Sequence, residues 1–441
     1  MLRHTIVWLL GAGLLAGAVF ASERQGLPGA NPSPIHLVRR PAAPFSAMAK
    51  LGRDIFFDAS LSSSGKMSCA SCHSPDHAYG PPTDGPVMLG GPDLTRPGMR
   101  AVPSLTYLER QPDFGIGPDD RENENVDLAQ QAEAGKTAVR AEKTATQTAQ
   151  SANNIVPQGG LFWDGRADTL QSQAAGPLLD PREMDGGSID IIAEKLRRAP
   201  YANKFAMLFG PNVFKDARLL VAEATFAVGR YQIEEPSFHS YTSKYDYWLE
   251  GKARLSEAEM RGLLLFNDPN KANCAGCHTS QPSRDGRPPL FTDFQYEALG
   301  APRNLALAET KDPNFFDLGI CGPIRKDVAD QTQFCGMFKT PTLRNTALRR
   351  AFFHNGVFHS LQEVMDFYNF RDTNPEKVYP VAADGKVDKL NDIPAQYHAN
   401  VDVSDPPFNR RLGDAPAMTA QDEADIIAFL KTLNDGYKPE E

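Results

Sequence analysis

Two copies of one short pattern, Cys-x-x-Cys-His, are the residues of this chain best suited to do chemistry. The first copy reads SCASCH at Ser68–His73, and the second reads NCAGCH at Asn273–His278. Together they use four of the six cysteines. Each thiol of such a pattern can add across a vinyl group of haem, and the histidine that follows can bind the iron from one face.

Two other uses of the pattern are a zinc site and a redox-active dithiol. Structural zinc would need further Cys or His ligands close to each motif, and neither motif has them at the usual spacing. A thioredoxin-like dithiol needs a strand–helix–strand setting, which is missing here. The repeat therefore favours two covalent c-type haems, with thioether bonds to Cys69, Cys72, Cys274 and Cys277 and with iron bound by His73 and His278.

The group on the open face of each iron decides between electron transfer and catalysis. Near the second motif, the segment SLQEVMDFYNF predicts a helix that begins with a capping box of Ser360 and Glu363. One face of this helix carries Met365 and Tyr368, and either side chain could approach an iron or belong to the core. A thioether ligand raises the haem potential, whereas a phenolate stabilises ferric iron and lowers it.

For the first haem, the candidates lie in Gly159–Asp185. Cleavage of a hydroperoxide needs a base that moves a proton between the two oxygens, and polar groups for the departing oxygen. Glu183, after a turn bounded by prolines at Pro177–Pro181, and Gln173 are suitable types. Trp163, one of three tryptophans, could pass electrons between two haems. The alternatives are a surface cap for Glu183 and a core position for Trp163.

The segments before the two motifs also repeat. LGRDIFFD, at Leu51–Asp58, precedes the first motif, and RGLLLFND, at Arg261–Asp268, precedes the second. Each predicts a short helix that ends at Phe and Asp before a loop into the motif. Ser256 and Glu259 predict a capping box at the start of the second helix.

This duplication predicts a mainly α fold with two cytochrome c-like haem domains and extensive loops. We expect an N-terminal domain at residues 43–250 and a C-terminal domain at 251–436, with the boundary near Gly251. A final helix over Thr419–Leu433 should pack on the second domain. Residues 111–154 have few large apolar side chains and predict an exposed insertion.

Residues 1–21 read as an export signal, in which Arg3 and His4 precede an apolar run and Ala21 completes a cleavage site. The alternative is an uncleaved membrane anchor, but the run is short for a full span. No later segment is apolar enough to cross a bilayer, so the mature chain is expected in the periplasm. The net charge of −9 argues against a nucleic-acid partner.

Two cysteines, Cys321 and Cys335, remain outside the motifs. In an oxidising compartment a disulfide between them is expected, worth about 3 kcal/mol for a loop this short. The alternative is two free thiols.

The motifs, taken in order, resemble those of the bacterial di-haem cytochrome c peroxidase and MauG family. The resemblance is carried by LGRDIFFDASLSSSGKMSCASCHSPDHAYG, RAVPSL, GLFWDGRADTLQSQAAGPL with EM, NCAGCH and FKTPTLRNTALRRAFFHNGVFHSLQEVMDFY. It covers nearly all of the mature chain except residues 111–154. It implies that the N-terminal haem reacts with peroxide and that electrons enter at the C-terminal haem.

The resemblance also implies roles for single residues. Glu183 stands at the distal acid–base position, with Gln173 and Pro177 at pocket positions. Trp163 matches the tryptophan that lies between the haems. Typical peroxidases of the family place Met as the sixth ligand of the second iron, but the alignment of SLQEVMDFY puts Tyr368 there, as in MauG-like members.

These assignments predict a periplasmic peroxidase that reduces hydrogen peroxide to water with electrons from a small cytochrome or cupredoxin. One alternative is a MauG-like oxidase that takes electrons from a protein residue. Others are a non-catalytic di-haem electron-transfer protein and a haem-based sensor.

Two features depart from the family. Many members bind calcium between the domains through the Asn of an RN-x-P motif and carbonyls of a T-x-P segment, which here read Arg100–Pro103 and Arg349–Ala351. Calcium is therefore doubtful, and we expect an arginine to supply the positive charge. Some members also carry a distal histidine on the first haem, but this chain has none between residues 78 and 238. The first haem is thus expected to be five-coordinate or water-bound and to react without prior reduction.

Overall fold

The computed structural model describes residues 28–41, 43–118 and 155–439. The expected export signal and most of the expected insertion at 111–154 lie outside these residues. Within the described part of the chain, no helix combines the length and apolar character needed to cross a membrane.

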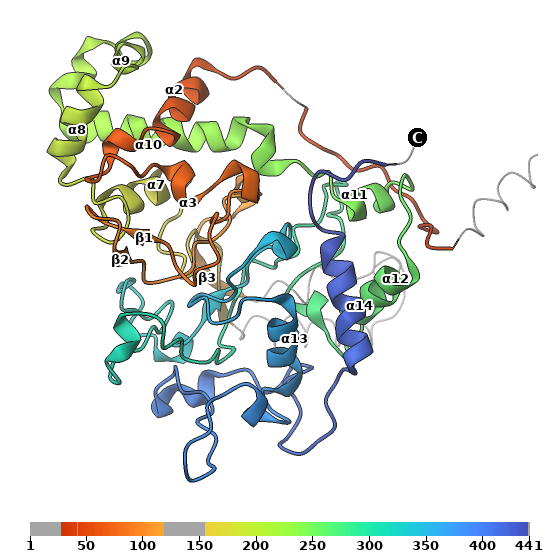
Figure 1. Cartoon of the computed structure of the whole chain (residues 1–441). Helices are drawn as coiled ribbons and strands as arrows, with labels where there is room; N and C mark the ends of the chain where they lie inside the picture. The colour runs from red at the N-terminus through yellow and green to blue at the C-terminus, as the bar shows by residue number, and fades with distance from the viewer. Residues whose placement is uncertain (1–27, 42, 119–154, 440–441) are drawn as a thin grey trace, which may run out of the picture.

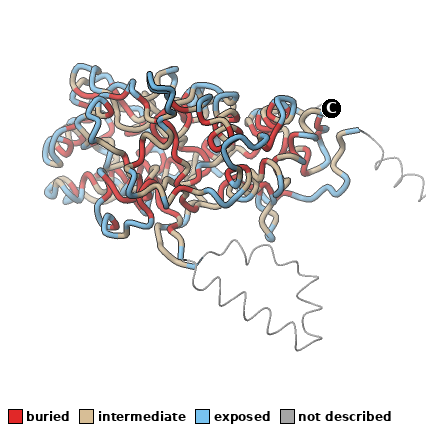
Figure 2. The backbone as a smooth tube through the Cα atoms, turned by 90° about the horizontal axis from the view of Figure 1, so that it is seen from below, coloured by how far each residue is buried: buried red, intermediate tan, exposed pale blue. Residues whose placement is uncertain are grey.

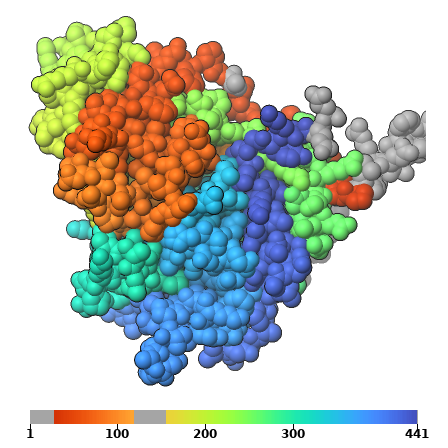
Figure 3. Space-filling view, viewed as in Figure 1, coloured from red at the N-terminus to blue at the C-terminus, as the bar shows by residue number. Residues whose placement is uncertain are grey.

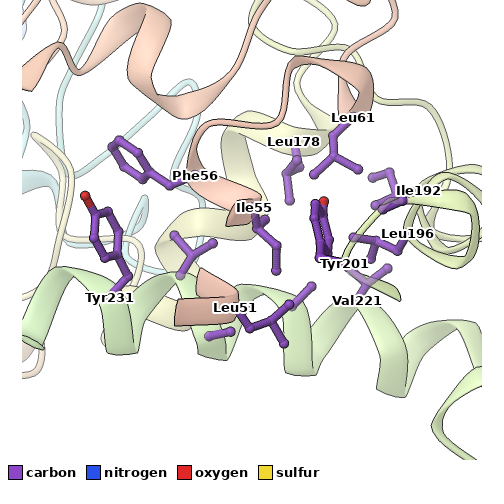
Figure 4. Packing of buried hydrophobic residues seen from close by; sticks show 14 of the residues in the cluster. Leu51, Ile55, Phe56, Leu61, Leu178, Ile192, Leu196, Tyr201, Val221 and Tyr231 are labelled. Carbon is purple, nitrogen blue, oxygen red and sulfur yellow. The ribbon is translucent and has the colours of Figure 1, made fainter. Parts of the chain in front are cut away.

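The N-terminal half gathers its helices around one long helix, α10 (Figure 1). These helices are α2 (Ala47–Phe56), α3 (Cys69–Cys72), α7 (Leu170–Leu179), α8 (Ile189–Arg198), α9 (Ala202–Phe209) and α10 (Ala217–Glu234). Their apolar faces form one core, in which Leu51 and Ile55 of α2 face Val221 and Tyr231 of α10 (Figure 4). This core holds the short helix α3, which carries the first cysteine motif.

The C-terminal half repeats this plan on a smaller scale. Its helices are α11 (Lys244–Leu249), α12 (Glu257–Phe266), α13 (Leu361–Phe370) and α14 (Ala420–Lys431). Phe266 of α12 and Phe429 of α14 meet edge to face, with ring centroids 5.2 Å apart. The α11 side chains Tyr245 and Trp248 pack in this second core although they precede Gly251. The second core therefore includes a segment that precedes the expected domain boundary.

The strands of the described residues are short antiparallel pairs rather than a central sheet. The pairs are β1 (Leu89–Gly90) with β2 (Arg96–Pro97), β3 (Gly115–Pro118) with β4 (Ile155–Gln158), and β5 (Tyr296–Glu297) with β6 (Phe338–Lys339). Long loops connect them, and buried residues run through the middle of the molecule (Figure 2). The expectation of a mainly α fold with extensive loops is confirmed.

Several local predictions are also confirmed. Ser256 with Glu259 caps α12, and Ser360 with Glu363 caps α13, each through a reciprocal capping box. The final helix is α14, which begins after Thr419 and packs against α12. Cys321 and Cys335 form a disulfide. The capping boxes depend on side chains three residues apart, so the sequence pattern is sufficient to predict them.

The repeat extends to a glycine at the crossing of each helix pair. A Cβ on Gly52 of α2 would lie 1.8 Å from the carbonyl oxygen of Ala227 in α10. A Cβ on Gly262 of α12 would lie 2.0 Å from the carbonyl oxygen of Asp425 in α14. Both helices that precede a cysteine motif therefore touch their partner backbone to backbone, which fixes the position of the motif that follows.

Replacing either glycine should destabilise the protein. Gly52→Ala and Gly262→Ala force the helix backbones apart, and such overpacking costs about 1–3 kcal/mol. Urea unfolding followed by circular dichroism should show a lower midpoint for each variant. Gly115→Ala is the control, because a Cβ there meets no atom within 4 Å. Equal midpoints for Gly52→Ala and Gly115→Ala would contradict the close crossing.

Candidate functional site

The first motif presents a histidine whose ring orientation is fixed by the backbone. Nδ1 of His73 pairs with the carbonyl oxygen of Tyr79 at 3.1 Å. Tyr79 has a φ of +54° and stacks on Phe238 with ring centroids 3.6 Å apart. The carbonyl is an acceptor only, so Nδ1 carries the proton and Nε2 is the nitrogen suited to bind a metal.

The second motif uses the same device with different residues. Nδ1 of His278 pairs with the carbonyl oxygen of Phe291 at 2.9 Å, and Phe291 also has a φ of +54°. Burial lowers the pKa of both His73 and His278 to about 4. Both imidazoles are therefore neutral at ordinary pH, which is the form that coordinates iron.

The motif cysteines form no disulfide, and Cys69, Cys72 and Cys274 pack against the two hydrophobic cores. Burial raises the pKa of Cys69, Cys72 and Cys274 to about 12, so these thiols stay protonated. In each motif both sulfurs come from one short turn, directly before the oriented histidine. Paired thiols beside a neutral imidazole fit the attachment of a c-type haem.

A large, mainly apolar cavity extends from the second motif to the segment that follows the first. Its wall includes Cys274, His278 and Tyr368 from the second half of the chain, and Trp163 and Gln173 from the first. The N-terminal and C-terminal segments are in contact across the face seen in Figure 3. The cavity therefore brings together several of the residues singled out from the sequence, but neither the first motif nor Glu183 is part of its wall.

Glu183 lies in a tight turn after α7, beside the first motif. Its N–H donates to the carbonyl of Asp180 at 3.0 Å, and its own carbonyl accepts from the N–H of Gly91 at 2.8 Å. A Cβ on Gly90 would lie 2.5 Å from the same carbonyl oxygen, so the β1–β2 hairpin presses directly on this turn. The charge of Glu183 contributes to the raised pKa of Cys72, which places its carboxyl near the motif thiols.

The protonation of Glu183 is tuned toward neutral pH. Burial raises the pKa of this half-buried carboxyl to about 7, and the carboxylate of Asp180 adds to the rise. The guanidinium groups of Arg166 and Arg182 oppose it. A carboxyl with a pKa near 7 can both accept and return a proton at physiological pH.

The prediction of a turn over Pro177–Pro181 is wrong for its first residues. Pro177 lies inside α7, which continues to Leu179, and the turn itself follows from Asp180. The helix begins with a capping box at Thr169. It can continue through Pro177 because the φ of proline is compatible with a helix, although one N–H donor is lost. Gln173 is buried on the same helix and reaches the cavity.

Trp163 is held between two segments that come from different halves of the chain. Its Nε1 donates to the carbonyl of Ala101 at 2.8 Å, and its own carbonyl accepts from the N–H of Lys339 at 2.9 Å. Its side chain lines the cavity that also contains the second motif.

Tyr368 and Met365 lie on one face of α13, as expected, and both line the cavity. Met365 is buried in the second core, and Tyr368 packs against the same core. The ring of Tyr368 stacks near Phe408 with centroids 5.3 Å apart, and its hydroxyl has no hydrogen-bond partner among the residues described. Burial raises the pKa of Tyr368, and the charges of Cys277 and Cys274 add to the rise. Tyr368 and Met365 therefore both border the cavity that contains Cys274 and His278.

Several polar groups of the cavity wall had no sequence signal beyond their residue type. His354 is buried and stacks on Phe338 at 3.5 Å, with Nε2 unpaired in the described structure. Lys339 donates to the carbonyl of Gly160, and burial lowers its pKa to about 7. The surroundings of His354 and Lys339 come from segments that are distant in the sequence, so no local sequence pattern predicts them.

Comparison with known proteins gives consistent matches. A family model described as di-haem cytochrome c peroxidase matches residues 46–254. The methylamine utilization protein MauG of Paracoccus denitrificans is 32% identical over 404 residues, which is 89% of this chain and 90% of the relative. Cytochrome c551 peroxidase of Nitrosomonas europaea is 30% identical, over 83% of this chain and 84% of its own length. The crystal structure of the diheme peroxidase BthA from Burkholderia thailandensis aligns with a TM-score of 0.74 and 36% identity, over 93% of this chain and 94% of that chain.

We predict that the purified protein contains substantially less than one calcium per chain. The chain has Ala101 where the family resemblance implies an asparagine ligand in many members, and Arg349 donates to the neighbouring carbonyl of Val102 at 2.9 Å. A guanidinium at a carbonyl disfavours a divalent cation there, because like charges repel. Elemental analysis after dialysis checks this, with iron as the internal standard. One calcium per chain would contradict it.

Proposed function

Because the chain belongs to the bacterial family of di-haem cytochrome c peroxidases and MauG proteins, which are oxidoreductases with two c-type haems, we propose that it reduces hydrogen peroxide to water. The observation that carries this proposal is Glu183, a half-buried carboxyl with a pKa of about 7 beside the first motif. We propose the periplasm as its location and a small cytochrome or cupredoxin as its electron donor.

Each motif would hold one haem through residues described above. The first haem would be bound by Cys69, Cys72 and His73, and the second by Cys274, Cys277, His278 and Tyr368. When bound, the haems supply the iron at which peroxide is cleaved and a second redox centre for the electrons that the reduction consumes.

Glu183 would act as the acid–base group of the reaction. As a carboxylate it accepts the proton of the peroxide oxygen that binds first, and as an acid it returns this proton to the departing oxygen, which leaves as water. The amide of Gln173 can donate a hydrogen bond to the departing oxygen. Overall, one peroxide, two electrons and two further protons give two waters. Gly90 packs closely against the backbone of Glu183, and this packing would hold the Glu183 carboxyl in place between the two proton transfers.

Trp163 and Tyr368 would control how the two sites share oxidising equivalents. Trp163 bridges the two halves through Ala101 and Lys339 and lies in the cavity wall between the sites. A phenolate oxygen of Tyr368 would stabilise the oxidised state of the second centre.

The same tyrosine supports a second candidate function, oxidation of a residue on a partner protein. Tyr368 borders the cavity that contains Cys274 and His278, and the aligned relatives named MauG match over most of this chain. Under this proposal the electrons for peroxide come from a protein substrate instead of a small donor. Turnover of peroxide with a reduced cytochrome, followed in the Soret band, separates the two proposals.

Glu183→Gln should slow the reaction of the resting ferric protein with peroxide by at least about 100-fold, because general acid–base groups contribute factors of roughly 10²–10⁴. Stopped-flow recording of the Soret band measures the bimolecular rate. Glu194→Gln is the matched control, since Glu194 lies on α8 and pairs with Arg198 at the surface. An unchanged rate in a Glu183→Gln protein that retains both haems would remove Glu183 from the mechanism.

The pH dependence of this rate has a defined sign. Glu183 must be ionised to accept the first proton, so the rate should fall as the pH drops below about 7, toward tenfold per unit. Asp180→Asn removes the carboxylate that raises the pKa of Glu183, and the profile should then move to lower pH. A profile that stays in place in Asp180→Asn would show that another group controls it.

Tyr368→Met should raise the reduction potential of one haem, because a thioether replaces a phenol oxygen bordering the cavity that contains Cys274 and His278. Tyr368→Phe should change the ferric spectrum of the same haem by removing the oxygen. Spectropotentiometric titration measures both effects, with Tyr247→Phe as the control because Tyr247 packs outside the cavity wall. If the two variants have the same haem reduction potentials and the same ferric spectra as the parent protein, Tyr368 is a core residue only.

A further inference from the structure

Arg349 places a positive charge in the cavity wall without an opposite charge to balance it. The side chain is half-buried, and burial lowers the pKa of its guanidinium to about 10. Among the described residues its guanidinium makes one hydrogen bond, from Nη2 to the carbonyl of Val102. No carboxylate of the described chain lies within ion-pair distance of it. Most of its N–H groups are therefore free to bind something else.

The other arginines in the interior differ from Arg349 in this respect. Each of them is paired with a carboxylate at 3.1 Å or less: Arg100 with Asp317, Arg303 with Asp392, Arg325 with Asp327, Arg344 with Asp246, and Arg371 with Asp372. Pairing raises the pKa of Arg100 and Arg344, whereas the pKa of Arg349 is lowered. A buried cation without a partner is costly, so the pattern of this chain indicates a partner that is not one of its own side chains.

The position of Arg349 identifies which group can supply that partner. Arg349 lines the cavity together with His77 and Ala78, which follow the first motif. Its Nη1 would lie 3.9 Å from a Cβ on Gly80, one residue after the tyrosine that orients His73. A haem attached at the first motif would carry two carboxylates, and a guanidinium binds a carboxylate through two parallel hydrogen bonds.

We propose that Arg349 binds a carboxylate of the haem held by the first motif. Arg349 belongs to the second half of the chain, whereas this haem would be attached to the first half. The contact would therefore join the two halves through the haem. The proposal rests on haem attachment at Cys69 and Cys72, proposed above, and does not depend on the reaction with peroxide. A cation at this position also raises the potential of the first haem relative to a neutral neighbour.

The test compares Arg349→Met with Arg350→Met. Arg350 is adjacent and exposed, 3.8 Å from Asp84, and serves as the matched control. Spectropotentiometry should show a more negative potential for one haem in Arg349→Met, no shift in Arg350→Met, and recovery in Arg349→Lys. A role limited to holding the halves together predicts a lower unfolding midpoint with both potentials unchanged, and this result would overturn the proposal.

Three further measurements keep the outcome decisive. A haem assay must first give two haems per chain, because a value of one would refute attachment rather than the role of Arg349. In a crystal structure of the parent holoprotein, a haem carboxylate oxygen should lie within about 3.5 Å of the guanidinium, and its absence would overturn the proposal whatever the variants do. If free carboxylates occupy Arg349 instead, the parent potential will shift with added acetate at constant ionic strength, which would also overturn it.

Discussion

A buried ion cluster centred on Arg100 holds the two halves of the molecule together around the cavity. Arg100 contacts Asp164 at 2.7 Å and Asp317 at 2.7 Å, and all three side chains are almost completely buried. Removing one member of such a cluster leaves a bare charge inside the protein, at a cost of about 3–5 kcal/mol. The cluster fixes the segment that follows Arg100, whose carbonyls at Ala101 and Val102 receive the indole N–H and a guanidinium N–H. The cavity wall therefore depends on this one charge balance.

Burial keeps the imidazoles of His73 and His278 and the thiols of Cys69, Cys72 and Cys274 uncharged. Burial also lowers the pKa of Lys339 to about 7, whereas Arg349 stays charged in the same cavity wall. Glu183, with a pKa of about 7, can change its protonation state at neutral pH. In an apolar site each remaining charge acts over a longer range than in water, so a few residues suffice to distinguish the two haem sites.

The sequence predicted features that depend on neighbours along the chain. The motifs, the capping boxes of α12 and α13 and the shared face of Met365 and Tyr368 all follow from spacing of a few residues. Pro177 was misplaced because a proline near the end of a helix and one in a turn share the same φ. The carbonyl partners of the histidines, the Arg100 cluster and the setting of His354 could not be predicted, because each joins segments that only the folded chain brings together.

The two histidine anchors show how a duplicated unit can diverge without losing its purpose. The carbonyl that orients His73 lies six residues later, whereas the one that orients His278 lies thirteen residues later. Both come from an aromatic residue with the same positive φ, a conformation that bulky side chains seldom adopt. What both halves retain is thus a backbone shape at the anchor point, while the length of chain before it has been free to vary. The loop between each motif and its anchor can therefore differ in length while the orientation of the imidazole stays the same.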